Sequence, residues 1–126
     1  GHGCMGAGLP MAIGAALATG RKAVVIDGDG SFQMTMNELG TIVQYGLQDQ
    51  VEVHIVDNGS GGIVSQFARL QGWHPVETEW FAGNPRFEAI AAAYGLSVSV
   101  HHTNQEGVWP ILEAGKAMDD MTTGRG

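Results

Sequence analysis

The sequence predicts an α/β domain, a three-layer sandwich in which a mostly parallel β-sheet has helices on both faces. The stretch "KAVVID" (22–27) is β-branched and lacks polar alternation, which is typical of a strand buried on both faces. Such runs alternate with helical patterns, so that the order after a first helix is β–α–β–α–α–β–α. The chain has 126 residues, which is enough for one domain with a single core.

The first half of the chain supplies three of these elements. "GLPMAIGAALATG" is rich in small residues and predicts a helix over 10–19, with Pro10 in its first turn and Gly20 at its end. The strand of 22–27 comes next. A second helix is expected over 35–46, because its apolar residues fall on one stripe: Met36, Leu39, Ile42 and Val43.

The second half supplies the remaining elements. "VEVHIVD" predicts a strand at 51–57, and "GGIVSQFARLQ" a helix over 61–71. "PRFEAIAAAYG" predicts a helix over 85–95, because proline suits its first turn and glycine its end. A strand is expected at 96–100, and a last helix within 104–120.

Residues 1–118 are expected to form one domain, and residues 119–126 a disordered tail. The sequence begins on a glycine-rich loop without a preceding strand and ends after a helix, so we expect a domain truncated at both ends. A monomer would leave the small-residue helix and the glycine-rich loops uncovered, which favours a homo-oligomer.

Composition narrows the classes of partner. The net charge is −7 and no stripe of Lys or Arg is present, so we expect no binding to nucleic acid. No apolar run approaches the roughly 18 residues of a membrane span, and no signal peptide is visible, so no membrane partner is expected. Cys4 is the single cysteine and cannot form an internal disulfide, which favours a cytoplasmic location.

Polar residues come after two predicted strands, at the edge where parallel sheets bind ligands. Asp29 follows the strand of 22–27 and Asn58 follows that of 51–57, so both are expected in one crevice. Carboxylate and amide oxygens are hard ligands that suit Mg²⁺. Nearby glycines expose backbone N–H groups for phosphate oxygens, and Ser31 adds a hydroxyl. The glycines are Gly28, Gly30, Gly59, Gly61 and Gly62. The sequence therefore predicts a site for a diphosphate bridged by a metal ion.

A competing hypothesis is an NAD(P)- or FAD-binding Rossmann domain. "GHGCMG" has the form G-x-G-x-x-G, and Asp27 follows Gly6 by 21 residues at a strand end, where an acid would bind a ribose hydroxyl. That fingerprint must follow a strand, however, and here it opens the sequence. The hypothesis also leaves "GDGSF" and "DNGSGG" without a role.

The segment "GDGSFQM" (28–34), together with "DNGSGG" (57–62), resembles the GDG…NN thiamin diphosphate motif. "GCMGAGLPMAIGAALA" and "NPRFEAIAAAYG" resemble further segments of acetolactate synthase-like enzymes, so the likeness covers about residues 1–115. It implies the C-terminal thiamin diphosphate-binding (PP) domain fold, without that domain's first and last elements. It also implies an enzyme that decarboxylates a 2-keto acid and can ligate the product to a second carbonyl compound.

The resemblance implies a role for each matching residue. The side chains of Asp29 and Asn58, with the main-chain carbonyl of Ser60, would bind Mg²⁺. The diphosphate would lie against a second set: Gly28, Gly30, Ser31 and Gly62.

Three further positions would contact the rest of the cofactor. Gly3 would accept a hydrogen bond from the exocyclic amine through its carbonyl. Met5 would support the bent conformation that brings this amine near the reactive carbon, since its flexible side chain fills irregular gaps. Ile63 would lie near the cofactor and the substrate.

The family's catalytic glutamate comes from a separate pyrimidine-binding (PYR) domain, and nothing in this sequence matches that domain. We therefore expect the chain alone to be nearly inactive and to need a PYR-type partner. Two departures affect the likeness: Asp57 replaces the first Asn of the usual pair, and Phe67 stands near where acetolactate synthases carry a Trp that shapes the second-substrate pocket.

Two other interpretations stay open: another thiamin-dependent 2-keto acid decarboxylase, and a non-catalytic relic of the fold. The histidines carry no expected metal role. His54 alternates along a strand as a satisfied side chain would, and His74, His101 and His102 show no ligand spacing with a cysteine or carboxylate.

Overall fold

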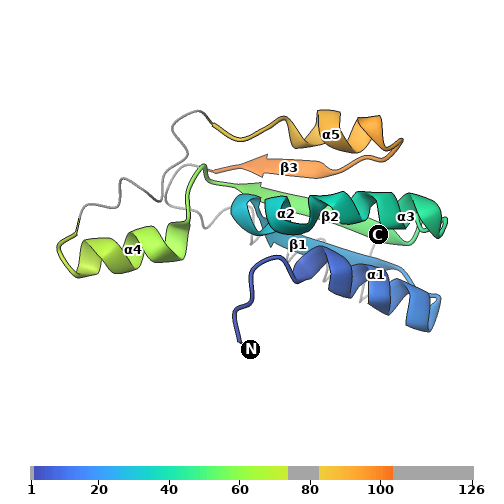
Figure 1. The fold of residues 1–126 in the computed structure, drawn as a ribbon, viewed down its shortest axis with the longest axis horizontal. Helices are drawn as coiled ribbons and strands as arrows, with labels where there is room; N and C mark the ends of the chain where they lie inside the picture. Colours follow the sequence, from blue (N-terminus) through green and yellow to red (C-terminus); the bar gives the residue numbers. More distant parts are fainter. Residues whose placement is uncertain (1, 74–82, 104–126) are drawn as a thin grey trace, which may run out of the picture.

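A computed structural model describes residues 2–73 and 83–103 of the chain (Figure 1). Three parallel strands form one sheet in the order β1–β2–β3, with bounds Ala23–Gly28, Val51–Asp57 and Ser99–His102. In the register, Val25 is paired with Val53 and Val56 with His101. The predicted α/β class with a parallel sheet is therefore confirmed.

Six helical segments accompany the sheet in the described ranges. In chain order they are α1 Gly8–Thr19, α2 Asp29–Thr35, the 3₁₀ turn η1 Met36–Glu38, α3 Leu39–Gln44, α4 Gly62–Leu70 and α5 Phe87–Ala93. The arrowheads of all three strands point toward α4, which lies away from the other helices (Figure 1). In these same parts of the chain, every helix is too short or too polar to span a bilayer.

One hydrophobic core joins the sheet to α1, α2, α3 and α5. Alternate residues of the strands, such as Val25, Val53 and Ile55, are buried on the face that these helices cover. Phe32 of α2 and Phe87 of α5 meet there edge to face, with ring centroids 5.6 Å apart. This contact fixes α5, which lies late in the chain, against the helix that comes after β1.

Most boundaries differ from the sequence-based expectation by one or two residues, and two elements differ more. The segment 29–35 is helical as α2 although the sequence pattern predicts no helix there, and a 3₁₀ turn separates it from α3. Its buried residues are Asp29 and Phe32, so no apolar stripe marks it, and the stripe within 35–46 covers only η1 and α3. The third strand is at 99–102 rather than 96–100. The expected last helix within 104–120 and the tail at 119–126 fall outside the described residues.

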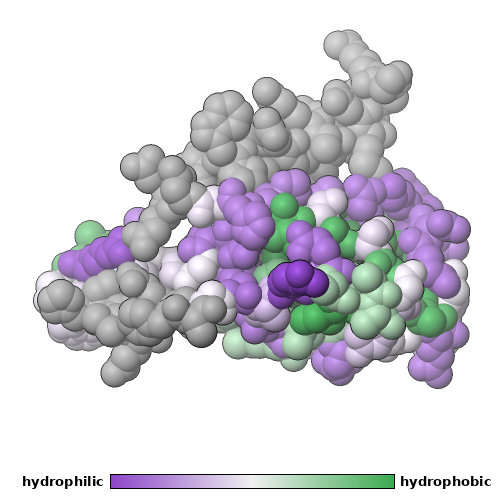
Figure 2. Space-filling model, turned by 90° about the horizontal axis from the view of Figure 1, so that it is seen from above, coloured by the Kyte–Doolittle hydropathy of each residue, from purple (hydrophilic) through white to green (hydrophobic). Residues whose placement is uncertain are grey.

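Apolar side chains also reach the surface. Seen from above, apolar residues form patches between polar ones (Figure 2). Large exposed side chains on α1 and α4 include Met11, Leu17, Ile63 and Leu70. Such surface suits association with another chain, but self-association stays a prediction.

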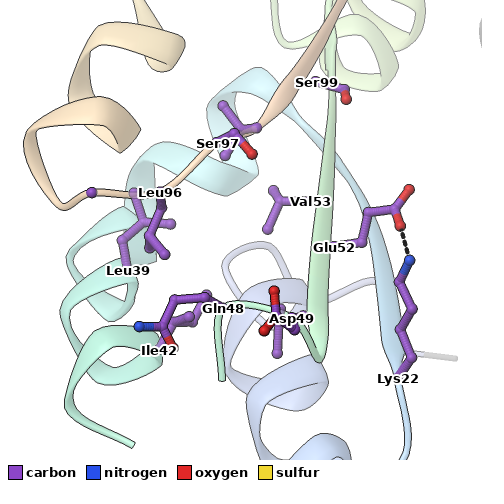
Figure 3. Close-up of a pocket in the computed structure, with 13 residues that line it drawn as sticks. Lys22, Leu39, Ile42, Gln48, Asp49, Glu52, Val53, Leu96, Ser97 and Ser99 are labelled. Atoms are coloured by element: carbon purple, nitrogen blue, oxygen red, sulfur yellow. Dashed lines mark ion pairs between the residues drawn. The ribbon is translucent and has the colours of Figure 1, made fainter. Parts of the chain in front are cut away.

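A cavity of about 530 Å³ opens at the amino ends of the strands (Figure 3). Polar residues line much of it, among them Gln48, Asp49, Glu52 and Ser97, and an ion pair joins Lys22 to Glu52 at its side. The cavity lies at the opposite end of the sheet from the carboxyl ends of the strands, where parallel sheets bind ligands.

The core assignment is tested by a matched pair of leucines. Leu39 is fully buried in α3, whereas Leu70 of α4 is 77% exposed. We expect Leu39→Ala to lower the free energy of unfolding by about 2–5 kcal/mol, because it leaves a cavity, and Leu70→Ala to change it little. Urea denaturation of both variants measures this, and equal losses would contradict the assigned core.

The ion pair at the sheet predicts a pH dependence. Hydrogen bonds from Lys22 and then from His54 lower the pKa of Glu52 below its usual 4.5. Glu52 therefore stabilises the fold above pH 4.5, and this contribution is lost as the pH falls through the lowered pKa. Because the pair is well exposed, we expect less than about 1 kcal/mol.

Thermal melts of the parent and Glu52→Gln, recorded from neutral pH downward, check this expectation. The difference in melting temperature should shrink in acid, and Lys22→Met should show the same trend because it removes the main partner. A difference that stays constant with pH would refute the assigned role.

Candidate functional site

Asp29 lies at the junction of β1 and α2, and its side chain is buried although it is charged, with 3% of the residue exposed. Its Oδ1 atom accepts a hydrogen bond from the backbone N–H of Gly30 at 2.9 Å. Its Oδ2 atom accepts one from the backbone N–H of Gly59 at 3.0 Å. The N-terminus of α2, directly after β1, therefore contacts the loop after β2, and Asp29 lies beside Gly59.

The loop after β2 is a tight turn. Asn58 Oδ1 accepts a hydrogen bond from the backbone N–H of Ser60 at 3.1 Å. Gly59 has a φ of +66°, a conformation that favours glycine. A Cβ atom on Gly62 would lie 2.9 Å from Asn58 Nδ2, so a side chain at that position would require the Asn58 amide to move. The contacts join Asp29 to the backbone of this loop, while the Asn58 side chain bonds within it.

Asn84 is a site residue that sequence reasoning missed. Its Nδ2 group donates to Asp29 Oδ2 at 2.6 Å and to Asp57 Oδ1 at 2.7 Å, and its Oδ1 accepts from Gln33 Nε2 at 3.0 Å. The amide thus bridges two carboxylates from different strand tips. Asn84 opens the segment "NPRFEAIAAAYG", but an asparagine before a proline shortly before a helix is typical of an ordinary boundary, so the pattern did not point to a site role.

The N-terminal segment is fixed beside the same site. The backbone N–H of Gly6 donates to Ser31 Oγ at 2.8 Å, and Thr35 Oγ1 donates to the Gly6 carbonyl at 2.9 Å. Gly3 has a φ of +64° and is exposed. Met5 is 53% exposed and Ile63, in the first turn of α4, is 85% exposed. These two apolar side chains are therefore open to contact by a ligand or another chain.

The geometry argues against a dinucleotide site. Asp27, which would have to face a ribose, has its Oδ2 atom buried with no hydrogen-bond partner in the described part of the chain. A Cβ atom on Gly8 would lie 2.9 Å from this oxygen, so the carboxylate is packed under the first residue of α1. The positive end of that helix favours a carboxylate there without any ligand.

The donor set at the strand tips fits a hard cation. Among the described residues, no group of three or more His, Cys, Asp or Glu side chains could hold a metal ion by itself. Magnesium does not need such a group, because it takes one or two carboxylates and completes its six oxygens with water and phosphate. Asp29 offers one buried carboxylate, and its contact with the Gly59 N–H places the loop that carries Asn58 and Ser60 beside it, so the residue types present fit that requirement.

Comparisons with known proteins give the family. Residues 1–123 match the family model described as the thiamine pyrophosphate enzyme, C-terminal TPP binding domain. Thiamine pyrophosphate and thiamin diphosphate are two names for one cofactor.

Curated relatives agree with this match. Acetolactate synthase of Arthrospira platensis is 46% identical over 98 residues, which cover 76% of this chain and 17% of that protein. The acetolactate synthase large subunit of Lactococcus lactis is 39% identical over an alignment covering 96% of this chain and 25% of that protein. The chain thus spans a quarter or less of these relatives.

A thiamine diphosphate-dependent 4-hydroxybenzoylformate decarboxylase of Rhodococcus jostii RHA1 has the same fold, with a TM-score of 0.66 at 22% identity. The alignment covers 79% of this chain and 23% of that one. The match to the family model covers nearly the whole chain, and the fold agrees with it. The chain therefore belongs to the C-terminal TPP-binding domain family of the thiamine pyrophosphate enzymes.

Proposed function

We propose that this domain binds the diphosphate of thiamin diphosphate through Mg²⁺, within an enzyme that decarboxylates a 2-keto acid and ligates the product to a second carbonyl compound. The observation that carries the proposal is the buried Asp29 carboxylate, hydrogen-bonded to the Gly59 N–H of the loop after β2. The acetolactate synthases among its relatives support the reaction class.

Different residues of the chain would bind the metal ion and the diphosphate. Asp29 and Asn58 would hold the metal ion by their side chains, and Ser60 would do so by its main-chain carbonyl. Asn58 then has to release or share the oxygen that now accepts from the Ser60 N–H. The Ser31 hydroxyl and the backbone groups of three glycines would hold the diphosphate oxygens. These glycines are Gly28, Gly30 and Gly62.

The N-terminal segment would orient the organic part of the cofactor. When bound, thiamin diphosphate supplies the nucleophilic carbon and the electron sink for decarboxylation. The Gly3 carbonyl would accept a hydrogen bond from its amine, and Met5 would pack against its rings. The bond between Gly6 N–H and Ser31 Oγ keeps this segment beside the diphosphate-binding tips. Ile63 would exclude water from the reacting groups.

The rest of the enzyme is part of the proposal. A PYR-type domain or subunit would supply the catalytic glutamate, and the chain by itself would have little activity. A homo-oligomer in the cytoplasm is the assembly that we propose for it. Phe67, 54% exposed on α4, would face the second-substrate pocket.

The metal role of Asp29 is tested by binding. We expect Asp29→Ala to weaken Mg²⁺-dependent binding of thiamin diphosphate about 10- to 100-fold, because a charged ligand contributes about 1.5–3 kcal/mol. Isothermal titration calorimetry measures this. Asp49→Ala is the control, since Asp49 is exposed at the opposite end of the sheet. Circular dichroism establishes that both variants fold, and unchanged affinity in folded Asp29→Ala would reject the site.

The need for a PYR-type partner is tested by complementation. We expect no decarboxylation of pyruvate by the 126-residue chain with thiamin diphosphate and Mg²⁺, and turnover once a PYR-type chain with its glutamate is added. The same PYR-type chain with that glutamate changed to glutamine should not restore activity. Turnover by the isolated chain would contradict the proposed need for a PYR-type partner, but it would not contradict the proposed metal site.

A further inference from the structure

Two histidines from neighbouring strands meet on β2's other face, away from the core. His54 Nδ1 lies 3.0 Å from His101 Nε2, and the rings are stacked with centroids 5.3 Å apart. The parallel register places His101 beside Val56, two residues beyond His54 on the same face of β2. The side chain of His54 is only 16% exposed, so the pair is held within the structure rather than extended into solvent.

A third group fixes the tautomer of His54. Its Nε2 atom lies 2.8 Å from Glu52 Oε1, and Glu52 is paired in turn with Lys22. The carboxylate accepts a hydrogen bond from Nε2–H, which leaves Nδ1 of a neutral His54 with its lone pair directed at His101. The hydrogen bond between the rings then requires His101 to carry its proton on Nε2.

We propose that His54 and His101 form a binding site for a divalent transition-metal ion, in which the ion replaces the proton held between the two nitrogens. A single tautomer change at His101, from Nε2–H to Nδ1–H, leaves a lone pair on each of the two facing nitrogens, and a rotation of the rings would direct both toward one ion. For metal–nitrogen distances of about 2.0–2.1 Å, a separation of 3.0 Å corresponds to a nitrogen–metal–nitrogen angle of roughly 95°. That angle suits neighbouring positions in the octahedral or square-planar geometry of Ni²⁺ or Cu²⁺.

Glu52 is the positioning residue of this site. A histidine that binds a metal commonly donates its other N–H to a carboxylate, which orients the ring and raises its basicity. Glu52 already has this arrangement with His54, while Lys22 balances its charge. The described residues offer two imidazoles and no third His, Cys, Asp or Glu ligand, so water completes the coordination.

The site is independent of the one proposed for Mg²⁺. His54 lies within β2, whereas the proposed Mg²⁺ ligands Asp29, Asn58 and Ser60 lie beyond the carboxyl ends of β1 and β2. Imidazole nitrogens select borderline transition metals, whereas the oxygens at the strand tips select Mg²⁺. A negative binding result at one site therefore does not contradict the proposal for the other site.

The test uses Ni²⁺ alone, titrated into the 126-residue chain by isothermal calorimetry. We expect one ion per chain, and a loss of more than about 100-fold in affinity for His54→Gln and for His101→Gln. Glu52→Gln keeps an acceptor oxygen but removes the charge, and should weaken binding about 10- to 100-fold. His102→Gln and His2→Gln are the matched controls, since both histidines are exposed, and neither should change the affinity at this site.

A second measurement works on the parent chain alone. Zn²⁺ should shift the ring proton resonances of His54 and His101 together at one equivalent, and leave those of His102 in place. Absence of binding, or equal binding by the folded His54→Gln and His101→Gln variants, would overturn the proposal. So would a shift of the His102 resonances with those of His54 and His101 unmoved.

Discussion

The candidate site depends on the parallel pairing of β1 with β2. That register pairs Gly28 with Val56, so both strands end at one edge, where α2 begins after β1 and a loop follows β2. The hydrogen bond from Gly59 N–H to Asp29 Oδ2 then joins two segments that are 30 positions apart in sequence. A slip of one residue would reverse the faces of β1 and separate these groups. Burial of Val25 and Ile55 against the helices fixes the register and therefore the site.

Sequence reasoning recovered the elements whose residues carry a local signal. The β-branched runs predicted β1 and β2 nearly to the residue, and glycine or proline punctuation predicted α1, α4 and α5 within a few positions. It missed α2, because that helix begins with Asp29 and Gly30, which are typical of a loop. It also missed Asn84, whose bonds to Asp29 and Asp57 depend on how distant segments fold together. The metal and diphosphate roles of individual residues remain predictions.

The histidine pair on β2 and β3 is a second feature that the sequence alone did not reveal. Alternation correctly placed His54 as a side chain with partners, yet its partner on β3 is separated from it by a helix-containing crossover. No spacing along the sequence reveals a cross-strand pair of this kind, since pairing depends on register rather than distance in the chain. His101 shows no ligand spacing along the sequence with a cysteine or carboxylate, but that spacing carries no information on its position beside His54 in the sheet.

The bridge made by Asn84 links ion capture to chain conformation. In the proposed site, a cation bound to Asp29 Oδ2 would compete with the Asn84 amide now 2.6 Å from it. Asn84 would then lose this bond and keep those to Asp57 and Gln33, just before α5. Linkage makes this reciprocal: whatever fastens that stretch elsewhere raises affinity for the ion. Binding of the proposed ion would thus exchange one internal hydrogen bond of Asn84 for a metal–oxygen contact at Asp29.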